Sequence, residues 1–117
     1  MRKIGERAFE FAVSVFKFCQ PLLERPGVGR VLGHQLLRSG TAVGANLQEA
    51  RAAQSKADFV SKNAIALKES RETEYWMRLL AAAEIVPASC LAGLQIEANE
   101  LIRIIAAIIV SAKKNNP

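Results

Sequence analysis

The chain contains 117 residues, about the size of one domain. It carries 16 Lys and Arg against 11 Asp and Glu, for a net charge of +5, and half of its residues are hydrophobic. This composition excludes a disordered chain, a collagen-like repeat and a small disulfide-stapled protein. Glu6 and Glu10 interrupt the apolar N-terminus, and the apolar run 104–112 is too short to cross a bilayer. We therefore expect a soluble cytoplasmic protein with no membrane contact.

Proline and capping residues mark the ends of the predicted helices. Pro21 together with Pro26 marks the exit from the first helix, because proline cannot donate the backbone hydrogen bond that continues a helix. Ser55 is a typical N-cap for the third helix, with Asp58 as the acid of a capping box. Pro87 stops that helix. The four predicted helices cover residues 4–23, 28–53, 56–84 and 89–114.

The fourth helix, which opens at Ser89, is the clearest example of apolar residues that recur at steps of three and four. Every predicted helix shows this spacing, whereas no β-type alternation is sustained anywhere in the sequence. The pattern predicts an all-α protein, with residues 1–117 forming a single domain.

The helices carry more apolar residues than one bundle core requires. A four-helix core needs one apolar stripe per helix, yet the first helix has a second stripe that includes Phe9 and Phe16. On the third helix, Trp76 and Leu79 lie well around the cylinder from the core stripe. The surplus predicts a second buried surface, and in a short single domain this means an interface between subunits.

The second helix is unusual because Gly33, Gly40 and Gly44, together with Gly29, fall within an arc of roughly 60°. Four glycines inside a helix cost about 3–4 kcal/mol relative to alanine. Close approach of another helix, within the chain or across an oligomer interface, is the simplest compensation. The alternative is a kink or break at 39–41, which would divide the segment into two shorter helices.

The sequence offers little for catalysis. The only histidine, His34, has no acid three residues before it, as a carboxylate-bridged metal site in a bundle would need. Glu69 with Glu72, and Glu97 with Glu100, share helix faces but have no histidine or cysteine to complete a metal shell. We expect these carboxylates to be solvated or salt-bridged. The prediction is a protein that is not an enzyme and has no cofactor and no metal.

The positive charge is distributed unevenly along the chain. The segment 56–84 is neutral, with five basic and five acidic residues, so the excess lies on the first two helices and at the C-terminus. Within 56–84, the i,i+4 spacing predicts surface pairs of Lys68 with Glu72 and of Glu74 with Arg78.

A basic surface repeated by several subunits would attract a polyanion such as nucleic acid. From the first two helices we select four candidate contacts with phosphate groups: Lys17, Arg30, Arg38 and Arg51. A solvated basic face without a ligand is the alternative interpretation.

Residues 36–80 contain a series of motifs: Leu37-Arg38-Ser39, Val43-Gly44-Ala45-Asn46, Glu49-Ala50, Ser55 with Asp58-Phe59, and Lys68-Glu69 followed by Glu72, Thr73, Tyr75, Trp76, Met77, Leu79 and Leu80. In this order they resemble the four-helix-bundle family of proteins encoded in intervening sequences of bacterial 23S rRNA. Two departures are a single arginine before Ser39, where the family has two, and Asn63, where an apolar residue is expected.

The resemblance implies an antiparallel, up-down four-helix bundle that closes into a homopentameric ring, and it carries over no catalytic residue. The family is also similar to the basic pentameric accessory protein of diversity-generating retroelements, which binds nucleic acid and a reverse transcriptase. Our leading hypothesis is an oligomeric, non-enzymatic module that binds the sugar-phosphate backbone of structured RNA or DNA. The alternative is a scaffold that holds a partner protein and has no direct role with nucleic acid. A ring of four or six subunits remains an alternative to the pentamer.

Overall fold

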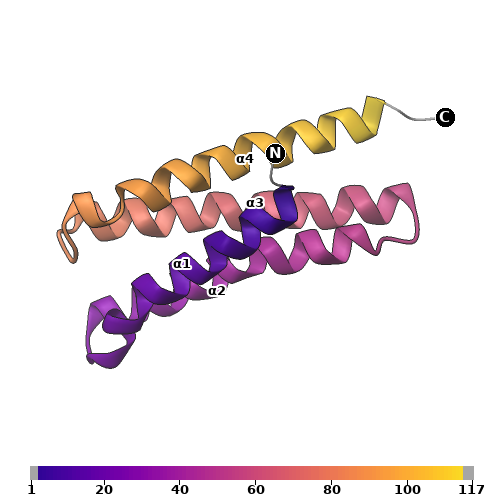
Figure 1. Cartoon of the computed structure of the whole chain (residues 1–117). Coiled ribbons are helices and arrows are strands. Elements are labelled where there is room, and N and C mark those ends of the chain that lie inside the picture. Colours follow the sequence, from indigo (N-terminus) through magenta and orange to yellow (C-terminus); the bar gives the residue numbers. More distant parts are fainter. Residues whose placement is uncertain (1–2, 115–117) are drawn as a thin grey trace.

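The computed structural model describes residues 3–114, and the secondary structure in this part of the chain is all helical, with no strand (Figure 1). Its elements are α1 (Ile4–Glu24), α2 (Val28–Arg51), α3 (Lys56–Ala82), the short 3₁₀ helix η1 (Ala88–Cys90) and α4 (Ala92–Lys114). The all-α prediction is confirmed. The molecule is elongated, with extents of 51 × 23 × 21 Å. No helix among the described residues is both long enough and apolar enough to cross a membrane.

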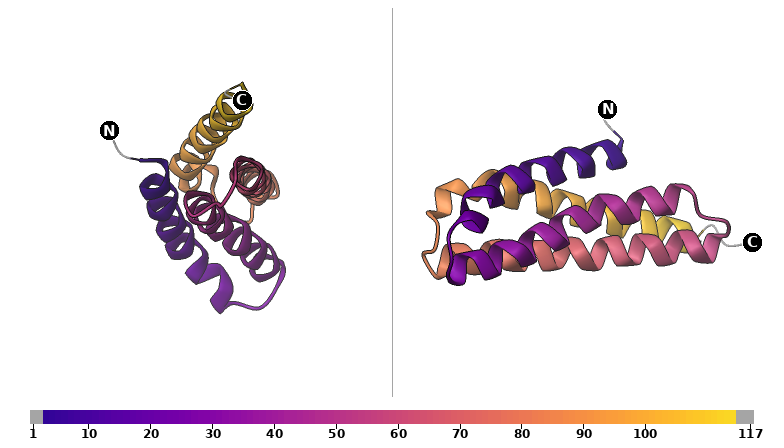
Figure 2. Two further views of the ribbon diagram at one scale, coloured as in Figure 1. Left: turned by 90° about the vertical axis from the view of Figure 1, so that its right-hand side faces the viewer. Right: turned by 90° about the horizontal axis from the view of Figure 1, so that it is seen from below.

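Successive helices run antiparallel, and the α2–α3 pair forms the centre of the bundle (Figure 1). α1 packs against α2, and α4 packs against α3, whereas α1 and α4 touch each other only over a small region. Figure 2 shows the result: the α1 and α4 ribbons diverge toward the two chain termini. One apolar stripe per helix forms the core, whose fully buried large side chains include Val15, Leu36, Val43, Met77, Leu80, Leu91, Leu101 and Ile105.

α2 is one continuous helix, so the alternative of a break at 39–41 is wrong. Its glycines face α1 of the same chain. A Cβ atom built on Gly40 would lie 2.8 Å from Val15, and one on Gly33 would lie 3.2 Å from Leu22. Hydrogen in place of a side chain therefore lets α1 and α2 approach closely.

Two predicted helix ends can be compared directly with the structure. Ser55 caps α3, since its hydroxyl accepts a hydrogen bond from the Asp58 amide at 3.0 Å, as the sequence predicted. Pro21 lies inside α1, as predicted, and the helix ends at Glu24, one residue beyond the predicted end. The proline lies in the last turn of the helix, where the loss of one backbone hydrogen bond does not stop the chain from completing that turn.

α3 ends at Ala82 rather than at Glu84, because the chain turns there into a left-handed cap. Glu84 has a φ of 59° and its amide donates to Ala81 at 3.1 Å, while the Ile85 amide donates to Leu80 at 3.0 Å. This pair of bonds is the Schellman arrangement that satisfies the last carbonyl groups of a helix. The 3₁₀ turn η1 follows, so α4 begins at Ala92, three residues later than predicted.

The buried polar side chains satisfy their hydrogen bonds locally. Asn63, which stands where an apolar residue was expected, is almost fully buried and donates from Nδ2 to the Phe59 carbonyl at 2.9 Å. Thr73 Oγ1 donates to the Glu69 carbonyl at 2.7 Å and lies 2.9 Å from Ser39 Oγ on α2. Within residues 3–114 no buried side-chain polar atom lacks a partner.

Candidate nucleic-acid interface

Arg38, one of the four predicted phosphate contacts, is held by two carboxylates of α3. Its guanidinium donates to Glu69 Oε1 at 3.1 Å and also to Glu72 Oε1. The same Glu72 oxygen accepts a hydrogen bond from Trp76 Nε1 at 3.2 Å. The predicted salt-bridged state of these glutamates is therefore confirmed, and the Arg38 guanidinium is engaged within the chain rather than directed only to solvent.

The other three predicted contacts, Lys17, Arg30 and Arg51, are exposed. Lys17 lies on α1, and the two arginines lie near opposite ends of α2, about 31 Å apart at 1.5 Å per residue. Arg51 also lines a small cleft together with the acidic residues Glu6 and Glu10. These three cations are therefore widely spaced, and carboxylates lie beside one of them.

A more uniform basic surface lies on α3, whose segment is electrically neutral in sequence. The exposed positions of this helix form one stripe, which we name the α3 face: Ala57, Ser61, Ala64, Ile65, Lys68, Arg71, Tyr75, Arg78 and Ala82. The stripe contains three cations and no carboxylate. Within residues 3–114 these cations make no ion pair, so the predicted Lys68–Glu72 and Glu74–Arg78 pairs do not form.

All four carboxylates of α3 lie off the α3 face. Glu69 and Glu72 turn toward Arg38 on α2, and Asp58 pairs with Lys62 at 3.6 Å. Glu74 is half-buried at the edge of the stripe. Packing against α2 and α4 therefore separates positive from negative charge around the helix, and this separation cannot be seen in the charge count of the segment.

One aromatic side chain stands among these cations. Tyr75 is 48% exposed and packs against Trp76 in a T-shaped arrangement, with a centroid distance of 5.2 Å and an angle of 74° between the ring planes. The Arg78 guanidinium carbon lies 5.8 Å from the centre of the Tyr75 ring. Trp76 is half-buried against the core and donates a hydrogen bond to Glu72. The residue that Tyr75 packs against is therefore itself held in place.

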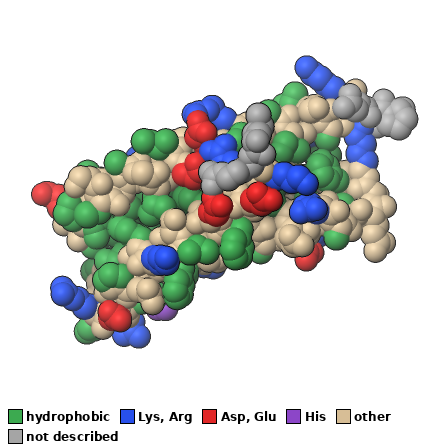
Figure 3. Space-filling view, viewed as in Figure 1, with side chains coloured by type: hydrophobic (Ala, Val, Ile, Leu, Met, Phe, Trp, Pro, Cys, Tyr) green, Lys and Arg blue, Asp and Glu red, His purple; other side chains and the backbone are tan. Residues whose placement is uncertain are grey.

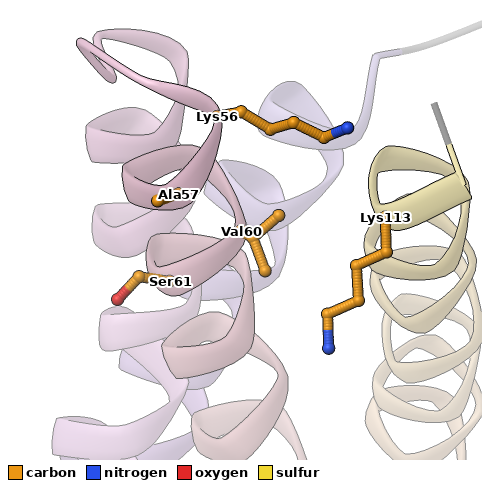
Figure 4. Close-up of a pocket in the computed structure, with 5 residues that line it drawn as sticks. All are labelled: Lys56, Ala57, Val60, Ser61 and Lys113. Carbon is orange, nitrogen blue, oxygen red and sulfur yellow. The ribbon is translucent and has the colours of Figure 1, made fainter. Parts of the chain in front are cut away.

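At its N-terminal end the α3 face joins a cleft between the start of α3 and the end of α4. The cleft has a volume of about 520 Å³ and is lined by Lys56, Ala57, Val60, Ser61 and Lys113. Figure 4 shows Lys56 and Val60 on the α3 side of an opening and Lys113 on the α4 side. Figure 3 shows further Lys and Arg side chains at this end of the molecule. From Lys56 to Arg78, the helix rises by about 33 Å.

Sequence reasoning missed the α3 face, although a signal for it was present. Lys68, Arg71, Tyr75 and Arg78 are spaced by three, four and three residues, which places them on one side of a helix. Counting charges by segment cancelled these cations against acids that point elsewhere.

The side chains considered for catalysis do not form a common site. His34 is exposed on α2, and no group of three or more His, Cys, Asp or Glu in the described part of the chain could hold a metal ion. Burial raises the pKa of the Cys19 thiol to about 11, and Cys90 is exposed in η1. Trp76 and Leu79, predicted at an interface or at close helix packing, are both half-buried along α3.

The surplus apolar stripe of α1 lies on the surface of the single chain. Phe9 is 69% exposed and Phe16 is 48% exposed, with Val13 between them. We name these three residues the α1 face. Because α1 packs on α2 and only slightly on α4, the α1 face and the α3 face belong to different sides of the bundle.

Comparisons with known proteins agree with this architecture. A solved structure of a protein with unknown function, from the S23 ribosomal protein family of Bacteroides thetaiotaomicron, is 37% identical and has a TM-score of 0.84. The match covers 92% of this chain and 98% of that one. None of the curated proteins matches the sequence. A sequence model of the 23S rRNA-intervening sequence proteins matches residues 2–107. The chain therefore belongs to the 23S rRNA-intervening sequence protein family.

Proposed function

We propose that this protein is a non-enzymatic module that assembles with further copies of itself and binds RNA or DNA through phosphate contacts along the α3 face. The observation that carries the proposal is the composition of that face, which exposes three unpaired cations and no carboxylate. Lys56 and Lys113 extend the same positive surface at its N-terminal end. Cations in a row contact a nucleic-acid backbone and carry no base preference of their own.

Assembly would multiply this charge. The exposed phenylalanines of the α1 face are suited to pack against another subunit, which would leave the α3 face of every copy open. In the pentameric ring that the family resemblance implies, the five chains would together carry a formal charge of about +25.

A matched pair of triple variants tests the proposal. K68Q/R71Q/R78Q removes the α3-face cations, whereas K17Q/R30Q/R51Q removes three exposed cations from α1 and α2 and leaves the same net charge. We expect wild-type affinity for RNA and DNA to fall steeply with salt. In the first variant the salt slope should fall by about one for each phosphate group that the protein no longer neutralises.

The control variant is expected to bind almost as well as wild type. An equal loss of affinity in both variants would show that binding follows the net charge of the protein and not the α3 face in particular. Absence of binding by the wild-type protein even at low salt would reject the nucleic-acid function altogether.

A protein-holding scaffold is the second candidate, favoured by apolar side chains that lie outside the α1 face. Val28 and Val31 at the start of α2 are 68% and 62% exposed, and Ile96 on α4 is 66% exposed. This function predicts a partner that stays bound after nuclease treatment. It also predicts that V28S/V31S or I96S weakens the complex more than K68Q/R71Q/R78Q does.

A further inference from the structure

We propose that the nucleic acid recognised by the α3 face presents an unpaired base, and that this base stacks on Tyr75. The inference rests on the proposed function and adds a class of ligand to it: single strands, and the loops or bulges of folded RNA, rather than continuous duplex.

Tyr75 lies in a position that suits it to stack on a base. Nearly half of its surface is exposed, and Tyr75 is not part of the hydrophobic core. Its exposure therefore leaves an aromatic side chain accessible from solvent. Arg71 precedes it by four residues and Arg78 follows it by three, so both cations share its side of the helix. The rise of an α-helix places them about 6 Å and 4.5 Å away along the axis. An aromatic ring between cations fits a strand whose base stacks while its flanking phosphates are neutralised.

The Tyr75 ring is held in place by its neighbours. Trp76 packs against Tyr75 in a T-shaped contact, Glu72 accepts a hydrogen bond from Trp76, and Arg38 on α2 binds Glu72. This chain of contacts links the ring to the α2–α3 pair at the centre of the bundle. A ring that is already oriented loses little side-chain entropy when a base stacks on it.

A continuous duplex gives Tyr75 no stacking partner. Bases inside a duplex are paired and stacked on their neighbours, so none of them offers a free face to an aromatic ring. The deep, narrow major groove of an RNA helix is also closed to side chains. We therefore expect a duplex to contact the α3 face through its phosphates, with little contribution from Tyr75.

The test compares single-stranded with duplex ligands. An oligothymidylate long enough to span the α3 face and a blunt DNA duplex of the same length are titrated at the same low salt against wild type, Y75A and Y75F. We expect Y75A to weaken binding of the oligothymidylate about 5-fold or more. Y75F keeps the ring and is expected to bind like wild type. Duplex affinity is expected to stay unchanged in both variants.

A second measurement needs no variant. Trp76 is the only tryptophan of the chain and lies against Tyr75, so its fluorescence reports directly on this site. We expect oligothymidylate to change this fluorescence and inorganic polyphosphate, which has no bases, to leave it unchanged.

The outcomes separate the two proposals. If K68Q/R71Q/R78Q weakens binding but Y75A binds both ligands like wild type, the stacking site is wrong and the phosphate-binding function stands. If Y75A loses affinity for single strand and duplex equally, Tyr75 supports the surface without contacting a base, and the inference again fails. If the wild-type protein binds neither ligand, the proposed function fails and the inference fails with it.

Discussion

Gly40 and Gly44 lie on the same side of α2, yet they leave different amounts of space for a side chain. A Cβ on Gly40 would stand 2.8 Å from Cγ1 of Val15, a fully buried and β-branched residue that cannot easily rotate away. A Cβ on Gly44 would meet Ala8 at 3.5 Å, which is ordinary contact. We expect G40A to destabilise the protein by about 1–3 kcal/mol.

G44A is the matched control and is expected to stabilise the protein by up to about 1 kcal/mol, because alanine is the better helix former. Urea denaturation of both variants measures the two free energies of unfolding. Equal stabilities would show that the α1–α2 distance does not depend on Gly40.

Glu84 is the only described residue other than glycine with a positive φ, and it provides a second test. Residues with a side chain pay about 1–2 kcal/mol for the left-handed conformation that this helix cap requires. We expect E84G to raise the free energy of unfolding by about 1 kcal/mol, measured by chemical denaturation. A83G, one residue earlier at a φ of −82°, is the control and is expected to give no gain.

Residue-level reasoning from sequence succeeded where the signal was local. The glycine arc of α2 correctly indicated a close helix neighbour, and Ser55 correctly predicted a cap. The cap at Glu84 was missed because a glutamate carries no signature of a left-handed conformation, whereas a glycine at that position would have indicated one.

At the level of elements, an ion-pair cluster joins α1 to α4. Arg7 donates to Glu97 at 2.7 Å and to Glu100 at 2.9 Å. Its hydrogen bonds hold the pKa of Glu100 below the ordinary value of 4.5. Because the ionised form is favoured in the folded chain, this contribution to stability is present above pH 4.5 and is lost as the pH falls below that value.

We therefore expect E100Q to be less stable than wild type at neutral pH and to lose less of its stability on acidification. Urea denaturation over a pH series measures both effects. R103Q is the control, because Arg103 also contacts Glu100 but is 69% exposed and is expected to contribute little. An unchanged pH profile in E100Q would contradict the assignment.

The sequence predicted the elements better than the contacts between them. Prolines, caps and apolar spacing are properties of a few neighbouring residues, and they gave four helices with ends correct to within about three positions. The partner of Glu72 was predicted wrongly as Lys68, because i,i+4 spacing ignores the neighbouring helix. Arg38, 34 residues away in sequence, binds Glu72 instead. Because Glu72 turns toward Arg38, Lys68 remains on the α3 face without an acidic partner within residues 3–114.

At the level of the whole molecule, the accessible surface of the single chain is larger than the average for a folded protein of its mass. Its accessible surface is 7058 Å², against about 6200 Å² for a typical folded protein of 12.7 kDa. The excess follows from the elongated shape of the bundle, which measures 51 × 23 × 21 Å. The exposed phenylalanines of α1, Phe9 and Phe16, are the observation that favours assembly.

We expect the purified protein to be oligomeric at micromolar concentration and F9S/F16S to dissociate it, as measured by light scattering or native mass spectrometry. V28S/V31S changes two exposed apolar residues outside the α1 face and is expected to leave the mass unchanged. A wild-type monomer would contradict the assembly. Loss of the oligomer only in V28S/V31S would move the interface to α2.

The divergence of α4 from α1 has a consequence for local unfolding. Beyond Glu100, the last helix runs past the start of α1 and is supported chiefly by α3 (Figure 1). Its final turns can therefore detach while the α2–α3 hairpin stays folded, so amide protons there should exchange with deuterium sooner than those of α2 and α3. Because Lys113 belongs to these turns, fraying of the helix would open the cleft beside Lys56 without disturbing Tyr75.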